Sequence, residues 1–124
     1  MHGNRALTTG RRDRKLRLKR REEQEAALKL RSLEATVRDF ERVALDLAHQ
    51  IAAEEARTGV TDPAHFAYST SATATRIRQS NLSTTLADLS ARLDSARREH
   101  ETMSTELHDT EVERRREDLR REAV

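Results

Sequence analysis

Apolar residues recur at alternating intervals of three and four along two stretches of this chain. The first stretch consists of Leu30, Leu33, Val37, Phe40, Ala44, Leu47 and Ile51. The second consists of Leu82, Leu86, Leu89, Leu93, Ala96, His100, Met103 and Leu107. This heptad spacing places the side chains on one face of an α-helix, as a narrow seam that must pack against another helix to leave water. The sequence therefore predicts two coiled-coil helices.

The composition excludes a broad globular core. Of the 124 residues, 35% are hydrophobic, 37% are charged and only 2% are aromatic, a balance that suits long helices with a narrow buried stripe. The absence of cysteine excludes disulfides and thiolate metal sites, and it favours a reducing, cytoplasmic compartment. Because no run of about 18 apolar residues occurs, we expect no membrane-spanning segment.

Residues 58–70, TGVTDPAHFAYST, separate the two seams and have the chemistry of a chain reversal. Gly59 can adopt the left-handed conformation that ends a helix. Asp62 and Pro63 can supply the N-cap and the first position of the next helix. With a reversal here, the two seams face each other within one molecule. The sequence therefore predicts an all-α fold, an elongated antiparallel two-helix coiled-coil hairpin.

The predicted hairpin divides into four parts. They are a basic, disordered N-terminal extension at 1–15, a first coiled-coil helix at 16–58, a hairpin turn at 59–70, and a second coiled-coil helix at 71–124 that ends in a frayed, charged tail. The second helix opens on a run of serine and threonine, which favour helix less than alanine or glutamate do. We therefore expect residues 69–80 to be either a weakly held first stretch of this helix or a loop.

The seams also predict which residues face each other. In an antiparallel hairpin the residue numbers of facing positions add up to a nearly constant value, and a value near 133 places Leu33 opposite His100 and Leu30 opposite Met103. In this register, the residues expected to hold the two helices together are Leu33, Val37, Phe40, Leu47, Ile51, Leu82, Leu86, Leu89, Leu93 and Met103.

The basic residues are concentrated at the start of the chain. Residues 1–21 contain nine lysines and arginines against Asp13 alone, a net charge of +8, whereas the remainder has 15 basic and 21 acidic residues, a net charge of −6. A basic head of this kind is attracted to acidic surfaces of protein, nucleic acid or lipid. The candidate partner-binding residues here are Arg17, Lys19, Arg20 and Arg21.

Two of the three aromatic residues lie in the predicted turn, as Phe66 and Tyr68. A two-helix tip has little interior for two rings, so each either covers the open end of the seam or serves as an exposed anchor for a partner. The covering role is slightly favoured for Phe66, and exposure is favoured for Tyr68 because of its polar hydroxyl. Both remain candidate partner-binding residues.

The sequence does not indicate an enzyme, a cofactor or a metal site. Catalysis needs a concave pocket with converging groups, which a two-helix hairpin does not offer. No glycine-rich phosphate loop occurs. In HETMSTELH the histidines His100 and His108 are eight residues apart, whereas a zinc-binding helix of the zincin type needs them four apart. We therefore predict a non-enzymatic protein without cofactors.

Residues 37–68, VRDFERVALDLAHQIAAEEARTGVTDPAHFAY, resemble the central region of alphaproteobacterial members of the flagellar export protein FliJ family. The matching features are RLKR at residues 17–20, the triplet Asp39, Phe40 and Glu41, and the motif DPAHFAY at residues 62–68. The similarity extends over about residues 16–112, and DPAHFAY is its most specific part.

This resemblance implies a small component of the flagellar type III protein export apparatus, which serves flagellum assembly and motility. Family members are antiparallel two-helix coiled coils that bind the ring-shaped hexamer of the export ATPase, the cytoplasmic part of the export gate and export chaperones. The implied location is cytoplasmic, at the inner-membrane base of the flagellum. Membrane association is then peripheral and only through partners.

Two other functions stay open from the sequence. The stretch RRDRKLRLKRR precedes heptads as the DNA-contacting helix of a basic-region leucine zipper does. Against DNA as the main target, Val37 and Ala44 stand where successive zipper leucines would fall, and the second seam supplies a partner within the chain. A coiled-coil adaptor of another pathway is the third possibility.

Overall fold

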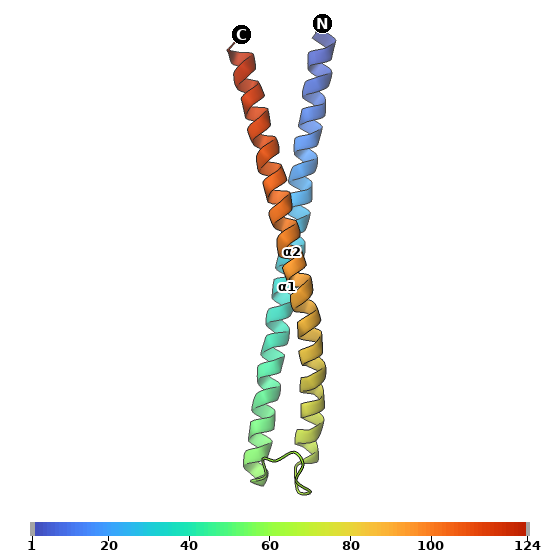
Figure 1. Cartoon of the computed structure of the whole chain (residues 1–124), viewed down its shortest axis with the longest axis vertical. Helices are drawn as coiled ribbons and strands as arrows, with labels where there is room; N and C mark the ends of the chain where they lie inside the picture. The colour runs from blue at the N-terminus through green and yellow to red at the C-terminus, as the bar shows by residue number, and fades with distance from the viewer. Residues whose placement is uncertain (1, 124) are drawn as a thin grey trace. The chain divides into compact units, whose positions relative to one another are not determined.

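The computed structural model describes residues 2–123 of the chain and the side chains of residues 10–123. It contains two α-helices, α1 over His2–Thr58 and α2 over Thr70–Glu122, joined by a loop at residues 59–69 (Figure 1). The protein is therefore the all-α helical hairpin that the two heptad seams predict. Within the described residues, neither helix has a stretch apolar enough to cross a bilayer.

The described residues fall into two compact units. The loop unit comprises residues 32–93, and the terminal unit comprises residues 2–31 together with 94–123. In each unit a segment of α1 packs against a segment of α2 that runs in the opposite direction. Charged contacts mark the pairing, with Glu55 and Arg76 joined in the loop unit and Lys19 and Glu106 in the terminal unit.

The core of the loop unit follows the predicted seam. Its buried side chains are Val37, Leu47, Ile51, Tyr68, Ala72, Thr75 and Leu93. The remaining predicted seam residues of this unit are half-buried, namely Leu33, Phe40, Leu82, Leu86 and Leu89. Half-burial is expected because a pair of helices covers each seam from one side only. The seam also extends to Ala72 and Thr75, in the stretch that the sequence predicted to be weakly held.

The core of the terminal unit is smaller and more polar. Leu16, Ala26 and Ala96 are buried, and Met103 is half-buried. Where apolar residues run out, ion pairs between the helices continue the seam. These pairs are Arg12 with Glu117, Asp13 with Arg114, Lys19 with Glu106 at 2.9 Å, and Glu23 with His100 at 2.9 Å.

The start of α1 differs from the sequence-based expectation. The helix begins at His2, so residues 2–15 continue the first helix instead of forming a disordered extension; Met1 lies outside the described residues. Within this segment, Arg12 and Asp13 form ion pairs with Glu117 and Arg114 in the distal part of α2. The same pairs hold the distal part of α2, which was expected to fray and is helical to Glu122.

The register between the helices also differs from the predicted one. In the terminal unit the residue numbers of the partners Lys19 and Glu106 add up to 125. Those of Asp13 and Arg114 add up to 127, and those of Lys29 and Glu99 to 128. With the other pairs described between the helices of this unit, the values run from 123 for Glu23 with His100 to 131 for Arg20 with Glu111. Their mean of about 127 lies about one heptad below the predicted 133. His100, for its part, forms a hydrogen bond with Glu23 over 2.9 Å. Both seams repeat every seven residues, so a shift of one heptad brings apolar positions opposite each other again.

The ends of the helices confirm one predicted feature and correct another. Gly59 has a φ of 73° and its N–H donates to the Glu55 carbonyl over 2.8 Å, as the left-handed residue that ends α1. The predicted N-cap at Asp62 is wrong. Ser69 caps α2 instead, because its Oγ accepts from the Ala72 N–H over 3.2 Å.

Replacing Gly59 by alanine should destabilise the protein by about 1–2 kcal/mol, the cost of a left-handed conformation for a residue with a Cβ. No atom lies within 4 Å of a Cβ placed at Gly59, so the cost is one of backbone conformation alone. Gly10 is the matched control, since it lies inside α1 with equally open surroundings. Thermal melts should show Gly10→Ala stabilising by about 0.5–1 kcal/mol. Equal effects of the two substitutions would contradict the assigned turn.

Candidate functional site

The loop at residues 59–69 has a defined local structure. Asp62 and Pro63 begin a turn in which the Asp62 carbonyl accepts from the His65 N–H over 3.0 Å, and the Asp62 Oδ1 accepts from the Ala64 N–H over 2.9 Å. Aspartate at the first position and proline at the second are preferred in such turns. The Asp-Pro pair therefore shapes the loop and does not begin the helix.

A second set of bonds, centred on His65, fixes the backbone on both sides of Phe66. The His65 carbonyl accepts from the Tyr68 N–H over 3.0 Å. The His65 Nδ1 accepts from the Ala67 N–H over 3.0 Å, which makes this ring nitrogen an acceptor. The residues around Phe66 are thus held by hydrogen bonds within the loop.

Phe66 is the most exposed large hydrophobic side chain described, with 96% of its surface open to water. Its ring stacks on the imidazole of His65, with centroids 4.6 Å apart. The favoured prediction, that Phe66 covers the end of the seam, is therefore wrong. A phenylalanine held in the open by an ordered loop matches the other alternative, an anchor that a partner protein could bury.

Tyr68 has the opposite role to the one predicted. Only 8% of its surface is exposed. Its hydroxyl accepts from the Arg76 Nε over 2.8 Å and donates to the Glu55 carboxylate over 3.4 Å. The Arg76 Nη2 also reaches that carboxylate, over 3.1 Å. Tyr68 was predicted to be exposed because of its hydroxyl, but Glu55 of α1 and Arg76 of α2 satisfy that group. The residue locks the loop to both helices and is not a partner-facing candidate.

A neighbouring contact ties the end of α1 to the start of α2. The Glu54 carboxylate accepts from the Arg57 Nε over 3.1 Å and from the Ser69 Oγ over 2.8 Å. These two bonds, chiefly the one from Arg57, lower the pKa of Glu54 to about 2. The serine that caps α2 is thus held by a carboxylate of α1.

The Glu54 contact predicts an acid-sensitive junction. Because the folded-state pKa lies below the usual value of 4.5, the contact stabilises the fold above about pH 4.5, and this stabilisation is lost as the pH falls towards 2. Glu54→Gln should remove this part of the pH dependence, as seen in thermal melts across that range. Glu41→Gln is the control, since Glu41 is exposed and makes no bond among the described side chains. Identical acid profiles for wild type and Glu54→Gln would contradict the role of the contact.

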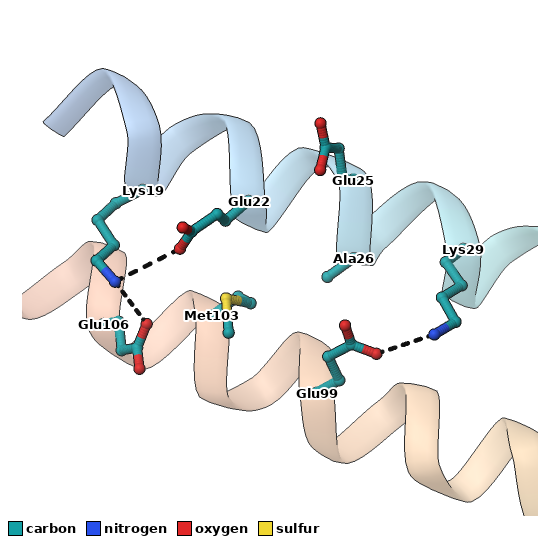
Figure 2. A pocket seen from close by; sticks show the side chains of 8 residues that line it. All are labelled: Lys19, Glu22, Glu25, Ala26, Lys29, Glu99, Met103 and Glu106. Atoms are coloured by element: carbon teal, nitrogen blue, oxygen red, sulfur yellow. Dashed lines mark hydrogen bonds and ion pairs between the residues drawn. The ribbon is translucent and has the colours of Figure 1, made fainter. Parts of the chain in front are cut away.

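The terminal unit contains a groove of about 540 Å³ between α1 and α2 (Figure 2). Its lining residues are Lys19, Glu22, Glu25, Ala26, Lys29, Glu99, Met103 and Glu106. Figure 2 shows Lys19 reaching both Glu22 and Glu106 at one end and Lys29 reaching Glu99 at the other, with Met103 between them. Its charged lining suits polar contacts with another protein and not the enclosure of an apolar ligand.

The four basic candidates separate into two pairs. Lys19 and Arg20 turn towards α2, where they meet Glu106 at 2.9 Å and Glu111 at 3.9 Å. The hydrogen bond from Glu106 raises the pKa of Lys19. Arg17 and Arg21 are exposed and form no ion pair among the described side chains. Lys19 and Arg20 therefore help to hold the hairpin, whereas Arg17 and Arg21 remain available to partners.

Comparisons with protein-family models, with curated proteins and with solved structures give no match to this chain. The fold and the local geometry thus define a general class, an all-α helical hairpin with an aromatic side chain presented by its loop. Among the described side chains, no group of three His, Asp or Glu residues gathers closely enough to hold a metal ion. The exposed candidates that form no ion pair among the described side chains are Phe66, Arg17 and Arg21.

Proposed function

We propose that the protein is a non-enzymatic component of the flagellar type III export apparatus. In this role it binds the export ATPase hexamer and the cytoplasmic part of the export gate, and it assists the delivery of export chaperones and their substrates. Its place is cytoplasmic, at the inner-membrane base of the flagellum. The proposal is supported by the resemblance of residues 37–68 to the FliJ family and by the helical-hairpin fold, which is the fold that the resemblance implies.

The single observation that carries the proposal is the conformation of the DPAHFAY motif. Asp62, His65 and Tyr68 each form bonds that shape the loop or join it to the helices, while Phe66 between them is left exposed. Asp62, His65 and Tyr68 thus hold the loop in its conformation, and Phe66 is the side chain that the loop exposes. Such a division is expected of a loop built to show one side chain to a partner.

The proposed function includes coupling the export ATPase ring to the export gate, and the symmetry of the ring supports this part of the proposal. A two-helix protein bound within a ring of six like subunits cannot contact all of them in the same way. It therefore stabilises some subunit conformations over others, and in return the state of the ring changes its affinity for the protein and for whatever else it holds. A second surface that contacts the export gate would then link the gate to the state of the ATPase.

A basic-region DNA-binding role is not proposed. The DNA-contacting helix of such proteins needs its cations free for phosphates and bases. Here Arg12, Lys19 and Arg20 face Glu117, Glu106 and Glu111 of α2. These carboxylates would lie beside the DNA backbone and repel it.

Binding assays with purified export ATPase and with the cytoplasmic domain of the gate test the proposal. We expect the wild type to bind at least one of them, and Phe66→Ala to weaken the affinity by roughly tenfold or more, as loss of an aromatic anchor does. Ile77→Ala is the matched control, because Ile77 is an exposed apolar residue of the same unit outside the loop. Binding of the wild type to neither protein would overturn the proposed function. Equal binding of Phe66→Ala would refute only the anchor.

A further inference from the structure

An outer basic stripe runs along α1 in the terminal unit. It consists of the exposed residues Arg11, Arg14, Lys15, Arg17 and Arg21. None of these side chains forms an ion pair with any other side chain among residues 10–123, in contrast to Arg12, Lys19 and Arg20. The basic head is therefore divided between one set of cations that holds α2 and another set that faces water.

The stripe occupies one face of the helix and has an apolar centre. Positions 11, 14, 18 and 21 are spaced by three and four residues, so they follow one line along the helix surface. Leu18 lies on this line and is 51% exposed, whereas Leu16, on the seam, is only 4% exposed. From Arg11 to Arg21 the stripe extends over about 15 Å.

We propose that the outer basic stripe binds directly to the surface of an anionic phospholipid bilayer. In this arrangement α1 lies along the interface, the five cations meet the lipid phosphates, and Leu18 enters the headgroup region. Clusters of four to eight lysines and arginines on a helix are attracted to anionic membrane surfaces, and each cation near such a surface adds to the affinity. This goes beyond the proposed function, in which the membrane is reached only through partner proteins.

The surroundings of the stripe favour a flat lipid surface over a nucleic acid. A duplex that received α1 in a groove would surround the helix on several sides and meet Glu106 and Glu111, whose side chains are 41% and 40% exposed. A bilayer touches one face only and leaves these carboxylates in water. Leu18 also gains nothing from phosphates, whereas it loses contact with water at a lipid interface.

Co-sedimentation of the purified full chain with lipid vesicles tests the proposal without any partner protein, so its outcome is independent of the proposed function. We expect binding to vesicles of equal parts phosphatidylglycerol and phosphatidylcholine, weakening as salt is added, and none to phosphatidylcholine alone. The triple variant Arg14→Glu, Arg17→Glu, Arg21→Glu should bind on the order of a hundredfold more weakly.

A matched triple variant distinguishes the effect of losing the stripe from the effect of changing the net charge. Arg115, Arg116 and Arg120 are exposed residues of α2, and their replacement by glutamate changes the net charge by the same amount. Circular dichroism first establishes that both triple variants keep the helical fold. We expect the α2 variant to retain most of its vesicle binding. Equal losses in the two variants, or failure of the wild type to sediment with anionic vesicles, would overturn the proposal.

Insertion of Leu18 has its own readout. The chain contains no tryptophan, so Leu18→Trp introduces a single fluorophore at the centre of the stripe. Its emission should shift to shorter wavelength when anionic vesicles are added, because the indole leaves water. An unchanged spectrum on bound vesicles would contradict insertion, and tighter binding to duplex DNA than to vesicles at the same salt would contradict the choice of ligand.

Discussion

Leu47→Asp is expected to unfold the loop unit. Leu47 is only 8% exposed and lies on the seam between the two helices. A carboxylate at this position would lose its hydration without gaining a partner, which costs several kcal/mol, and a loss above about 3 kcal/mol is a large part of the stability of a small fold. Circular dichroism at room temperature should show a marked loss of helix.

Leu45→Asp is the control for this result. Leu45 is two residues away on the same helix, but it is 58% exposed. The same substitution there should leave the helix content unchanged and shift the stability by no more than about 0.5 kcal/mol. Similar spectra for the two variants would mean that the seam does not pass through Leu47.

Tyr68→Ala is expected to give the second largest loss, about 3–5 kcal/mol as for other aromatic residues truncated at buried positions. The substitution removes a ring that is 8% exposed and takes away the hydroxyl between Glu55 and Arg76. It thereby removes the contacts of the loop with Glu55 of α1 and with Arg76 of α2. Chemical denaturation followed by circular dichroism measures the loss.

Two further variants test the contribution of the Tyr68 hydroxyl by itself and the contrast between Tyr68 and Phe66. Tyr68→Phe keeps the ring and should cost about 1 kcal/mol, the usual value of a hydrogen-bonded hydroxyl. Phe66→Ala, at the exposed ring two residues earlier, should leave the stability unchanged within about 0.5 kcal/mol. A stability loss at Phe66 as large as the loss at Tyr68 would contradict the roles that the structure gives to the two rings.

Much of the fold could be predicted because local rules determine it. The three-and-four spacing from Leu30 to Ile51 and from Leu82 to Leu107 specifies two helices and the face that each one buries. Gly59 specifies where the first helix ends, because only glycine adopts the left-handed conformation at little cost. Neither inference depends on contacts between distant residues.

The register could not be predicted, because a heptad pattern is nearly unchanged by a shift of seven residues. The lower sum of facing residue numbers goes with the length of the loop and with the start of α2 at Thr70. The sequence suggested Asp62 as the cap of α2, yet Ser69 is an equally good cap by composition. Only the contact of Ser69 with Glu54, which depends on the packed helices, distinguishes the two.

The candidate interaction residues depended still more on distant contacts. Tyr68 is buried because Glu55 and Arg76 meet its hydroxyl, and no local signal marks that pairing. The division of the basic head likewise depends on carboxylates almost ninety residues away, such as Glu106 opposite Lys19. The glutamates of the second helix, such as Glu106, Glu111 and Glu117, were a signal that sequence reasoning could have used.

The distance between labels at positions 41 and 85 tests the central claim most directly, that α1 and α2 pair within one molecule with residue numbers adding up to about 127. Both positions are exposed and lie in the loop unit. Spin labels there, in a doubly labelled chain diluted with unlabelled chain, should report a short distance, set by about 10 Å between helix axes and the two label arms. The pair 41 and 92 should lie farther apart. A short distance that vanishes on dilution, or a shorter one for 41 and 92, would contradict the hairpin or its register.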